Sequence, residues 1–182
     1  MIKDDISQVL ITEAKIIERC KELGEIITKD YQGEQPILVA LLKGSVCFLT
    51  ELCKYIELPL EIDFLDVSSY AGTESTGEIN IRKDLDRSIK DREILIIEDI
   101  VDTGRTLKTV KRFLYNKGAK NIKIAALLDK KCRRVVEIDA DYVGFEIEDY
   151  FVVGFGLDYN QKYRNLPFIG VLKKELYSQE VN

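Results

Sequence analysis

Three carboxylates stand close together in the segment ILIIEDIVDTGRTL at residues 94–107. Glu98 and Asp99 follow four apolar residues, and Asp102 opens a short polar turn that leads into a helical pattern. In open α/β sheets, ligands bind at the carboxyl ends of the strands, where the next helix offers backbone N–H groups to an anion. The segment therefore predicts a ligand site at a strand-to-helix turn.

The turn at 102–106 has the composition of a phosphate site. Thr103 and Thr106 supply hydroxyl donors, Gly104 lets the backbone approach a ligand closely, and Arg105 adds a positive charge. A capped helix after a simple turn would account for the threonines and the glycine alone. A phosphate monoester is the expected occupant.

The acidic pair Glu98 and Asp99 needs a further explanation, because two carboxylates repel a neighbouring phosphate unless they bind something else. A solvated strand end is the simplest alternative. Sugar hydroxyls, which donate hydrogen bonds, and a divalent cation are the two candidate ligands. A sugar phosphate handled together with Mg²⁺ would satisfy both.

The composition excludes several other kinds of chemistry. The chain has 182 residues and no histidine, which removes Ser-His-Asp and Cys-His catalysis, so any metal must bind to oxygen ligands. The segment GTESTGEI has the glycine spacing of a Walker A loop, but Glu78 and Ile79 stand where that loop requires Lys and Ser or Thr. The net charge of −5 argues against nucleic acid as the main partner.

No targeting signal or membrane-spanning run is visible in the sequence. The N-terminal residues lack an apolar signal region, and no apolar run approaches the roughly 18 residues that a membrane span needs. The four cysteines form no C-x-x-C pair. We expect a cytoplasmic protein with reduced thiols and no membrane partner.

The elements that must position these residues follow an α/β pattern. Helices are expected at 12–31, at 46–56 and after Thr106, from apolar residues at helical spacing. Strands are expected at 37–42, 61–70, 79–83, 94–99 and 122–129. The strand at 61–70 should turn Ile62, Phe64 and Val67 inward. Right-handed strand–helix–strand units predict an open, mostly parallel twisted sheet flanked by helices.

One domain is expected over residues 1–182, because neither a repeat nor a linker divides the chain. The polar segment AGTESTGE joins two expected strands, which predicts a flexible hairpin tip at about 69–79. The aromatic-rich remainder after Arg133 predicts further short strands and a small C-terminal lobe.

The segment ILIIEDIVDTGRTL closely resembles the phosphoribosyl pyrophosphate-binding motif of the type I phosphoribosyltransferases. Further segments narrow the resemblance to the hypoxanthine-guanine phosphoribosyltransferase family and occur in its order: LLKGS, SSYAGTESTGEI, LLDKK and YVGFEIEDYFVVGFGLDYNQKYRNLP. The resemblance covers nearly all of residues 37–172. It implies the type I phosphoribosyltransferase fold, with a small lobe over the base site. The implied enzyme is a purine salvage transferase that moves the 5-phosphoribosyl group to N9 of hypoxanthine or guanine, giving IMP or GMP and pyrophosphate.

The resemblance also implies roles for the residues of the first motif. Glu98 and Asp99 would bind the ribose 2- and 3-hydroxyls, directly or through Mg²⁺, and the turn at 102–106 would hold the 5-phosphate. Asp102 matches the proposed general base that removes the N7 proton of the purine. Arg105 occupies a position that is a lysine in some relatives, which matters little if the backbone amide binds the phosphate.

Pyrophosphate and metal contacts are implied elsewhere in the chain. Lys43 and Gly44 match the family's pyrophosphate loop, in which a non-proline cis peptide bond aims backbone groups at the leaving group. Arg164 matches a second pyrophosphate contact. Asp158 matches a carboxylate of the base site that is associated with a second Mg²⁺.

The purine contacts implied by the resemblance are Lys130, Phe151 and Val152. An ammonium carries donors only, so Lys130 would select the 6-oxo group of the purine over the amino group of adenine. Phe151, which would otherwise be interpreted as a core residue, would stack on the base, and the backbone of Val152 would bind its edge. In the mobile loop, Ser69 and Tyr70 would close over the site and exclude water.

Several alternatives stay open at this point. The segment KKCRRVVEIDAD resembles the family least, so no role is expected there beyond Lys130. A regulator of the same fold that binds RNA or DNA is the main rival, and an enzyme acting on xanthine or a pyrimidine is the second. The family implies Mg²⁺ as cofactor, a purine base and phosphoribosyl pyrophosphate as small-molecule partners, and a homodimer or homotetramer.

Overall fold

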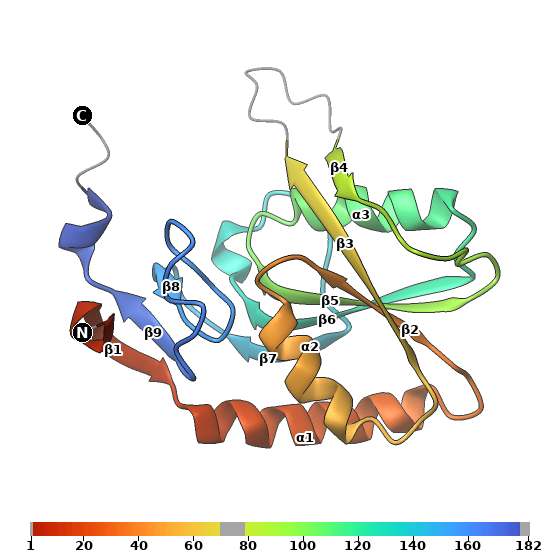
Figure 1. Ribbon diagram of the computed structural model, residues 1–182, viewed down its shortest axis with the longest axis horizontal. Coiled ribbons are helices and arrows are strands. Elements are labelled where there is room, and N and C mark those ends of the chain that lie inside the picture. Colours follow the sequence, from red (N-terminus) through yellow and green to blue (C-terminus); the bar gives the residue numbers. More distant parts are fainter. Residues whose placement is uncertain (1, 70–78, 179–182) are drawn as a thin grey trace.

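A six-stranded sheet forms the centre of the computed structural model, which describes residues 2–69 and 79–178 (Figure 1). The strand order is β4-β3-β2-β5-β6-β7, and only β4 is antiparallel to its neighbour. The predicted open, mostly parallel sheet is confirmed. Its strands are β2 (Ile37–Leu41), β3 (Glu61–Ser69), β4 (Ile79–Lys83), β5 (Glu93–Val101), β6 (Asn121–Asp129) and β7 (Tyr142–Glu146).

Helices cover both faces of this sheet. α1 (Glu13–Asp30) and α2 (Val46–Leu52) lie on one face and α3 (Arg105–Asn116) lies on the other (Figure 1). In β2, Leu38 and Ala40 pack toward α1 and α2, whereas Ile37 and Val39 pack toward α3. This alternation explains why the strand is apolar at every position, since both of its faces are buried.

The helix boundaries follow local signals in the sequence. Thr12 caps α1, where its hydroxyl accepts a hydrogen bond from the backbone N–H of Lys15 at 3.4 Å. The helix expected at 46–56 is α2 followed by a short 3₁₀ turn, η2 (Cys53–Tyr55). α2 buries Phe48, Leu49 and Leu52 against the sheet.

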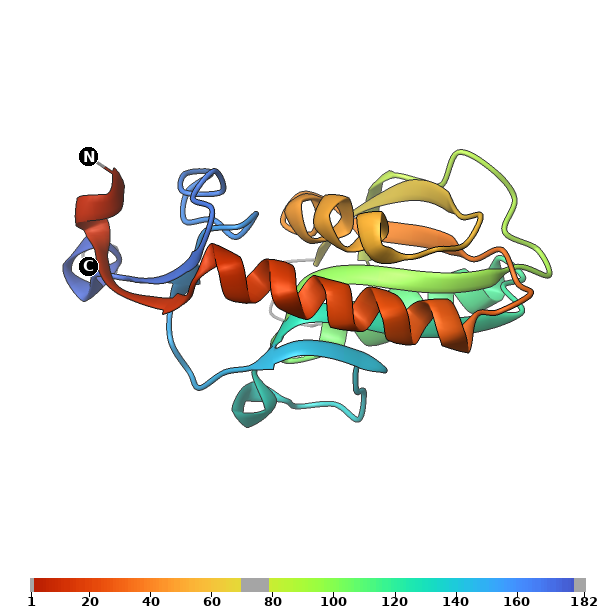
Figure 2. The same cartoon turned by 90° about the horizontal axis from the view of Figure 1, so that it is seen from below.

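One edge of the sheet is bonded by a side chain of α1. Arg19 donates from Nε to the carbonyl of Gly144 at 3.0 Å and from Nη2 to that of Val143 at 2.8 Å. Both carbonyls belong to β7, which is the outermost strand on this side. α1 therefore lies beside the edge of the sheet (Figure 2).

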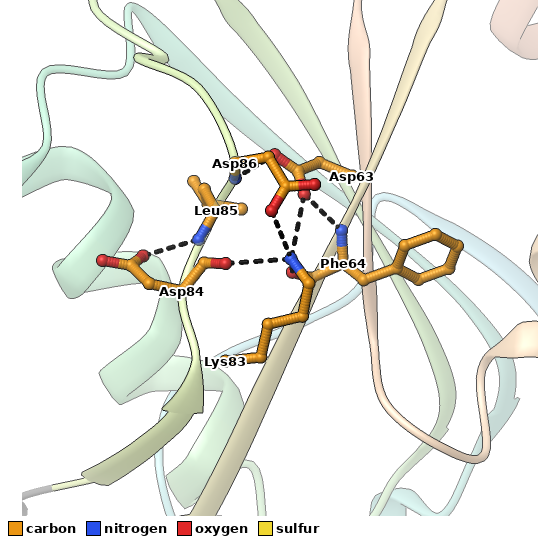
Figure 3. A network of polar contacts seen from close by, with 6 residues as sticks. All are labelled: Asp63, Phe64, Lys83, Asp84, Leu85 and Asp86. Carbon is orange, nitrogen blue, oxygen red and sulfur yellow. Dashed lines mark hydrogen bonds and ion pairs between the residues drawn. The ribbon is translucent and has the colours of Figure 1, made fainter.

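The expectation that Ile62 would face inward is wrong, because its side chain is 45% exposed. The neighbouring Asp63 is buried instead and accepts hydrogen bonds from the N–H groups of Phe64 at 2.7 Å and Asp86 at 2.9 Å. Lys83 lies 3.5 Å from the Asp63 carboxylate and also donates to Asp86 at 3.0 Å (Figure 3). A carboxylate with several partners is thus buried at a position that the expected alternation assigned to the outward face.

The predicted small lobe forms around a second sheet with strand order β1-β9-β8, at the left of Figure 1. It combines both ends of the described chain, since β1 (Ile6–Ile11) pairs with β9 (Ile169–Leu172), and β9 pairs with β8 (Val152–Val153). The sequence analysis did not identify β1. Most residues of β1 are half-buried or exposed, so its pattern carries little signal.

None of the helices in the described part of the chain combines the length and the apolar character that a membrane crossing requires.

Candidate active site

Glu98 and Asp99 lie near the carboxyl end of β5, at the central part of the sheet edge. Burial, and then the negative charge of Asp99, raise the pKa of Glu98 well above its ordinary value. Burial also raises the pKa of Asp99, and the positive charge of Arg164 offsets part of that increase. Two poorly solvated carboxyl groups therefore stand side by side, an arrangement that a bound cation would stabilise.

The pyrophosphate loop implied by the resemblance lies directly against this acidic pair. The peptide bond between Leu42 and Lys43 is cis, as the resemblance implied. A Cβ atom on the next residue, Gly44, would lie 1.6 Å from Oδ2 of Asp99, so a side chain there would force the loop or the carboxylate to move. The ends of β2 and β5 thus bring the loop and the carboxylates into contact.

The turn at 102–106 leads directly into α3. Gly104 is the N-cap residue and has φ of +80°, in the left-handed region that favours glycine. The N–H of Arg105 lies 3.4 Å from the hydroxyl of Thr103, and the helix runs on from Arg105. The first turn of a helix carries N–H groups without intrahelical acceptors, so the turn can bind an anion.

Asp102 is held from the segment that follows β6. Arg133 Nε lies 3.2 Å from Oδ1 of Asp102, and the guanidinium of Arg133 also lies 3.2 Å from Asp149. Arg134 donates from Nη1 to the backbone carbonyl of Asp102 at 2.5 Å, and its Nη2 pairs with the buried carboxylate of Asp129. These side chains connect the predicted general base to the loop before the predicted base site.

Sequence reasoning missed Arg133 and Arg134, because the resemblance assigned nothing beyond Lys130. The segment they belong to also covers the phosphate turn, since the N–H of Val135 donates to the carbonyl of Thr103 at 3.1 Å. The only signal in the sequence was the pair of adjacent arginines shortly after a predicted site lysine.

Lys130 follows β6 and is buried, with 8% of its surface exposed. Its Nζ donates to the carbonyl of Tyr150 at 2.5 Å and lies 3.8 Å from Asp149. Phe151, which follows Tyr150, is 37% exposed, so the alternative interpretation of Phe151 as a core residue is wrong. Val152 begins β8 and is itself buried.

A third group of predicted residues gathers around Arg164. Its Nη2 lies 2.7 Å from the carboxylate of Asp158, and its Nη1 donates to the carbonyl of Gly156 at 2.7 Å. Gln161, which sequence reasoning missed, accepts hydrogen bonds from Arg164 at 3.3 Å and from Lys43 at 3.4 Å. Both predicted pyrophosphate cations therefore share one amide oxygen.

The small lobe contacts the pyrophosphate loop through backbone. A Cβ atom on Gly156 would lie 2.0 Å from the carbonyl oxygen of Gly44. Ser69 is the last residue of β3, and Tyr70 lies outside the described residues, so the loop closure expected at about 69–79 stays a prediction.

The donor set at the end of β5 fits Mg²⁺. Magnesium in proteins is commonly bound by one or two carboxylates together with water and substrate phosphate oxygens. Glu98 and Asp99 supply two such carboxylates, whereas Asp158 pairs with Arg164. Within residues 2–69 and 79–178, no three acidic or cysteine side chains form a group that could hold one metal ion.

The sequence matches the phosphoribosyl transferase domain family over residues 7–160. A hypoxanthine-guanine phosphoribosyltransferase of Lactococcus lactis is 56% identical over 175 residues, which are 96% of this chain and 95% of the relative. The chain belongs to the hypoxanthine-guanine phosphoribosyltransferase family. A family member of the same name from Streptococcus pyogenes is 53% identical and covers 98% of this chain and 100% of its own.

Solved structures of hypoxanthine phosphoribosyltransferases share the fold. The crystal structure of the Staphylococcus aureus protein is 52% identical, has a TM-score of 0.94 and covers 97% of this chain and 96% of its own. A Trypanosoma cruzi hypoxanthine phosphoribosyl transferase is 36% identical, with a TM-score of 0.92 and coverage of 97% and 96%. The resemblance stated from the sequence is confirmed, and the protein is a glycosyltransferase of the phosphoribosyltransferase class.

Proposed function

We propose that the protein transfers the 5-phosphoribosyl group of phosphoribosyl pyrophosphate to N9 of hypoxanthine and guanine. One observation carries the proposal: Asp99 lies against Gly44, beside the cis peptide bond, at the same sheet edge as the turn at 102–106. Groups that would bind ribose hydroxyls, pyrophosphate and a 5-phosphate are therefore proposed to surround one position. The anomeric carbon of the ribose would lie at that position.

The substrate would be held mainly by the ends of β5 and α3. The hydroxyls of Thr103 and Thr106, the side chain of Arg105 and the N–H groups of the first helical turn would bind the 5-phosphate. Glu98 and Asp99 would accept hydrogen bonds from the ribose hydroxyls.

The leaving pyrophosphate would lie between the two cations that share Gln161. Lys43 and Arg164 supply positive charge, and backbone groups of Gly44 supply further contacts. Bound Mg²⁺ would neutralise charge on the departing pyrophosphate. Glu98 and Asp99 are the proposed ligands of one ion, and Asp158 that of a second.

The chemical step would exchange pyrophosphate for a purine nitrogen with inversion at the anomeric carbon. Asp102 would accept the N7 proton while N9 attacks, a role typically worth about 10²–10⁴-fold in rate. The carboxylate of Asp102 follows β5, at the sheet edge where the substrate is proposed to bind, and it pairs with Arg133 in the free protein. Water exclusion by Ser69 and Tyr70 would protect the positively charged ribose.

The purine would be selected by Lys130, Phe151 and Val152. Lys130 Nζ already donates to a carbonyl oxygen, that of Tyr150, and would donate to the 6-oxo group in the same manner. Adenine carries an amino group in that place. Two hydrogen-bond donors would then face each other, so adenine should bind poorly. We further propose a cytoplasmic enzyme that forms a homodimer or homotetramer, as the family implied, to be checked by light scattering in solution.

The test is an ultraviolet assay with phosphoribosyl pyrophosphate, Mg²⁺ and a panel of bases. Hypoxanthine and guanine should be converted to nucleotides, and adenine and uracil should not. Omitting Mg²⁺, with a chelator present, should abolish turnover. Conversion of adenine at a comparable rate, or of no purine at all, would contradict the proposal.

A further inference from the structure

An aromatic stack connects Phe151, the proposed base-stacking residue, to the last described turn of the chain. The ring of Tyr177 lies nearly parallel to that of Phe151, with ring centroids 4.5 Å apart and an angle of 16° between the planes. Tyr159 contacts Phe151 edge-on, at a centroid distance of 5.6 Å and an angle of 86°. One face of the Phe151 ring is therefore covered by Tyr177, and Tyr159 packs against it edge to face.

Part of Phe151 stays accessible to solvent. The residue stays 37% exposed although two aromatic rings contact it. Because Tyr177 covers one face, the opposite face is left for a flat heteroaromatic ligand, which gains from parallel stacking at such a distance. Lys130 Nζ donates to the carbonyl of Tyr150, so its ammonium group lies at the backbone of the residue that precedes Phe151.

We propose that Tyr177 is a positioning residue of the base site. It holds the Phe151 ring in the orientation that stacks on the purine, so that base, Phe151 and Tyr177 form a stack of three rings. The inference rests on the proposed function, because it places the purine on the open face of Phe151.

Tyr177 is itself held firmly by the small lobe. It follows the 3₁₀ turn η4 (Lys174–Leu176), and its ring packs against the buried cluster Val153, Tyr163, Leu166 and Leu172. The N–H of Lys173 donates to the carbonyl of Asp5 at 3.0 Å, and the hydroxyl of Tyr163 donates to the Asp5 carboxylate at 2.9 Å. The turn that carries Tyr177 is thus anchored to the N-terminal segment.

Phe151 depends on such support because its own chain segment fixes only the backbone. The N–H of Leu172 donates to the carbonyl of Phe151 at 3.0 Å, and the two-residue strand β8 follows. A half-exposed ring would otherwise sample several orientations, and ordering it would weaken base binding. Tyr177 orders the Phe151 ring before the base binds. The loss of Tyr177 should therefore lower the affinity for the base.

The test separates the two substrates. Tyr177→Leu keeps an apolar side chain and removes the ring, and we expect the KM for hypoxanthine to rise about threefold to tenfold, the range that one aromatic pair carries. The KM for phosphoribosyl pyrophosphate and kcat should change by less than about twofold, since neither depends on the stack. Tyr177→Phe keeps the ring and should restore the wild-type KM.

Leu176→Ala is the matched control, because Leu176 lies exposed in the same turn. It should leave both KM values at the wild-type level. A lower KM for hypoxanthine in Tyr177→Leu would overturn the proposal, because Tyr177 would then occupy the face that the base needs. An unchanged KM, or an equal rise for both substrates together with a lower melting temperature, would overturn it as well. If the wild-type protein converts no base, the proposed function is contradicted as well. If the wild-type protein is active, the variants test the role of Tyr177 alone.

Discussion

The three carboxylates near the end of β5 have different surroundings, and these differences match different tasks. Glu98 and Asp99 are crowded together, and burial raises the pKa of both. Asp102 stands apart from them and faces the guanidinium of Arg133. We propose the first two as ligands of ribose hydroxyls and metal, and the third as the group that acts on the purine base.

Replacing Asp102 with asparagine should test its part in the chemistry. The amide keeps the shape of the side chain and an oxygen that Arg133 can bond, so we expect the fold to remain. The variant cannot accept the N7 proton, so kcat should fall by about 10²–10⁴-fold. Steady-state kinetics should show little change in the KM for phosphoribosyl pyrophosphate, and a kcat near the wild-type value would remove Asp102 from the proton transfer.

Between elements, Gly44 and Asp99 approach each other so closely that a Cβ atom on Gly44 would overlap the carboxylate. Gly44→Ala would place a methyl group where Oδ2 of Asp99 now lies, 1.6 Å from the ideal Cβ position. Either the loop or the carboxylate must move, and a displacement of about 1 Å at a reacting centre can cost about 10²-fold in rate.

We therefore expect kcat/KM of Gly44→Ala to fall by at least about tenfold while the circular dichroism spectrum is unchanged. Gly33→Ala is a useful control, because nothing lies within 4 Å of its Cβ position. Its positive φ of 84° predicts a small loss of stability without a loss of activity. Wild-type activity in Gly44→Ala would show that the site tolerates a shift of this loop.

Elements whose parts are contiguous in the sequence could be predicted well. The strand, turn and helix around 94–116 follow one another directly. The apolar run, the glycine and the threonines therefore predict the strand-to-helix turn and, with it, an anion as the ligand. Contacts between distant segments left no such pattern. Arg133 reaches Asp102, and Gln161 reaches Lys43 across 118 residues, which only the folded chain brings together.

Buried polar groups limited the sequence analysis in a second way. Asp63 occupies a buried position in β3 because N–H groups and Lys83 compensate its charge. The alternation of apolar residues around it could not show that compensation. The strand β1 was missed for a related reason, since it is stabilised by pairing with β9 rather than by an apolar face of its own.

At the scale of the whole molecule, the buried cysteine of α1 reports on the integrity of the main core. Burial raises the pKa of Cys20 to about 12, whereas Cys132 lies exposed. Thiolates react with alkylating reagents, and thiols do not. In the folded protein at pH 8, a maleimide should modify Cys132 and leave Cys20 untouched until denaturant unfolds the chain, as mass spectrometry of peptides can show.

The same shift predicts an alkaline loss of stability. The unfolded chain releases the Cys20 proton near its ordinary pKa of 9.0, and the folded protein retains it to about pH 12. Folding stability attributable to Cys20 is therefore complete below pH 9 and falls above it, by at most about 1.4 kcal/mol per pH unit. Urea unfolding of Cys20→Ala between pH 8 and 10.5 should show a shallower decline than wild type, whereas Cys132→Ala should run parallel to wild type.

The position of Arg19 beside β7 has a consequence for how copies of the chain can meet. An outermost strand with free carbonyls is a template on which another chain can pair, which leads to open-ended aggregates. The guanidinium of Arg19 bonds two carbonyls of β7, so an incoming strand would have to displace a charged group from bonds that it already makes. Association of subunits is thereby directed away from sheet extension at this edge and toward surfaces built from side chains.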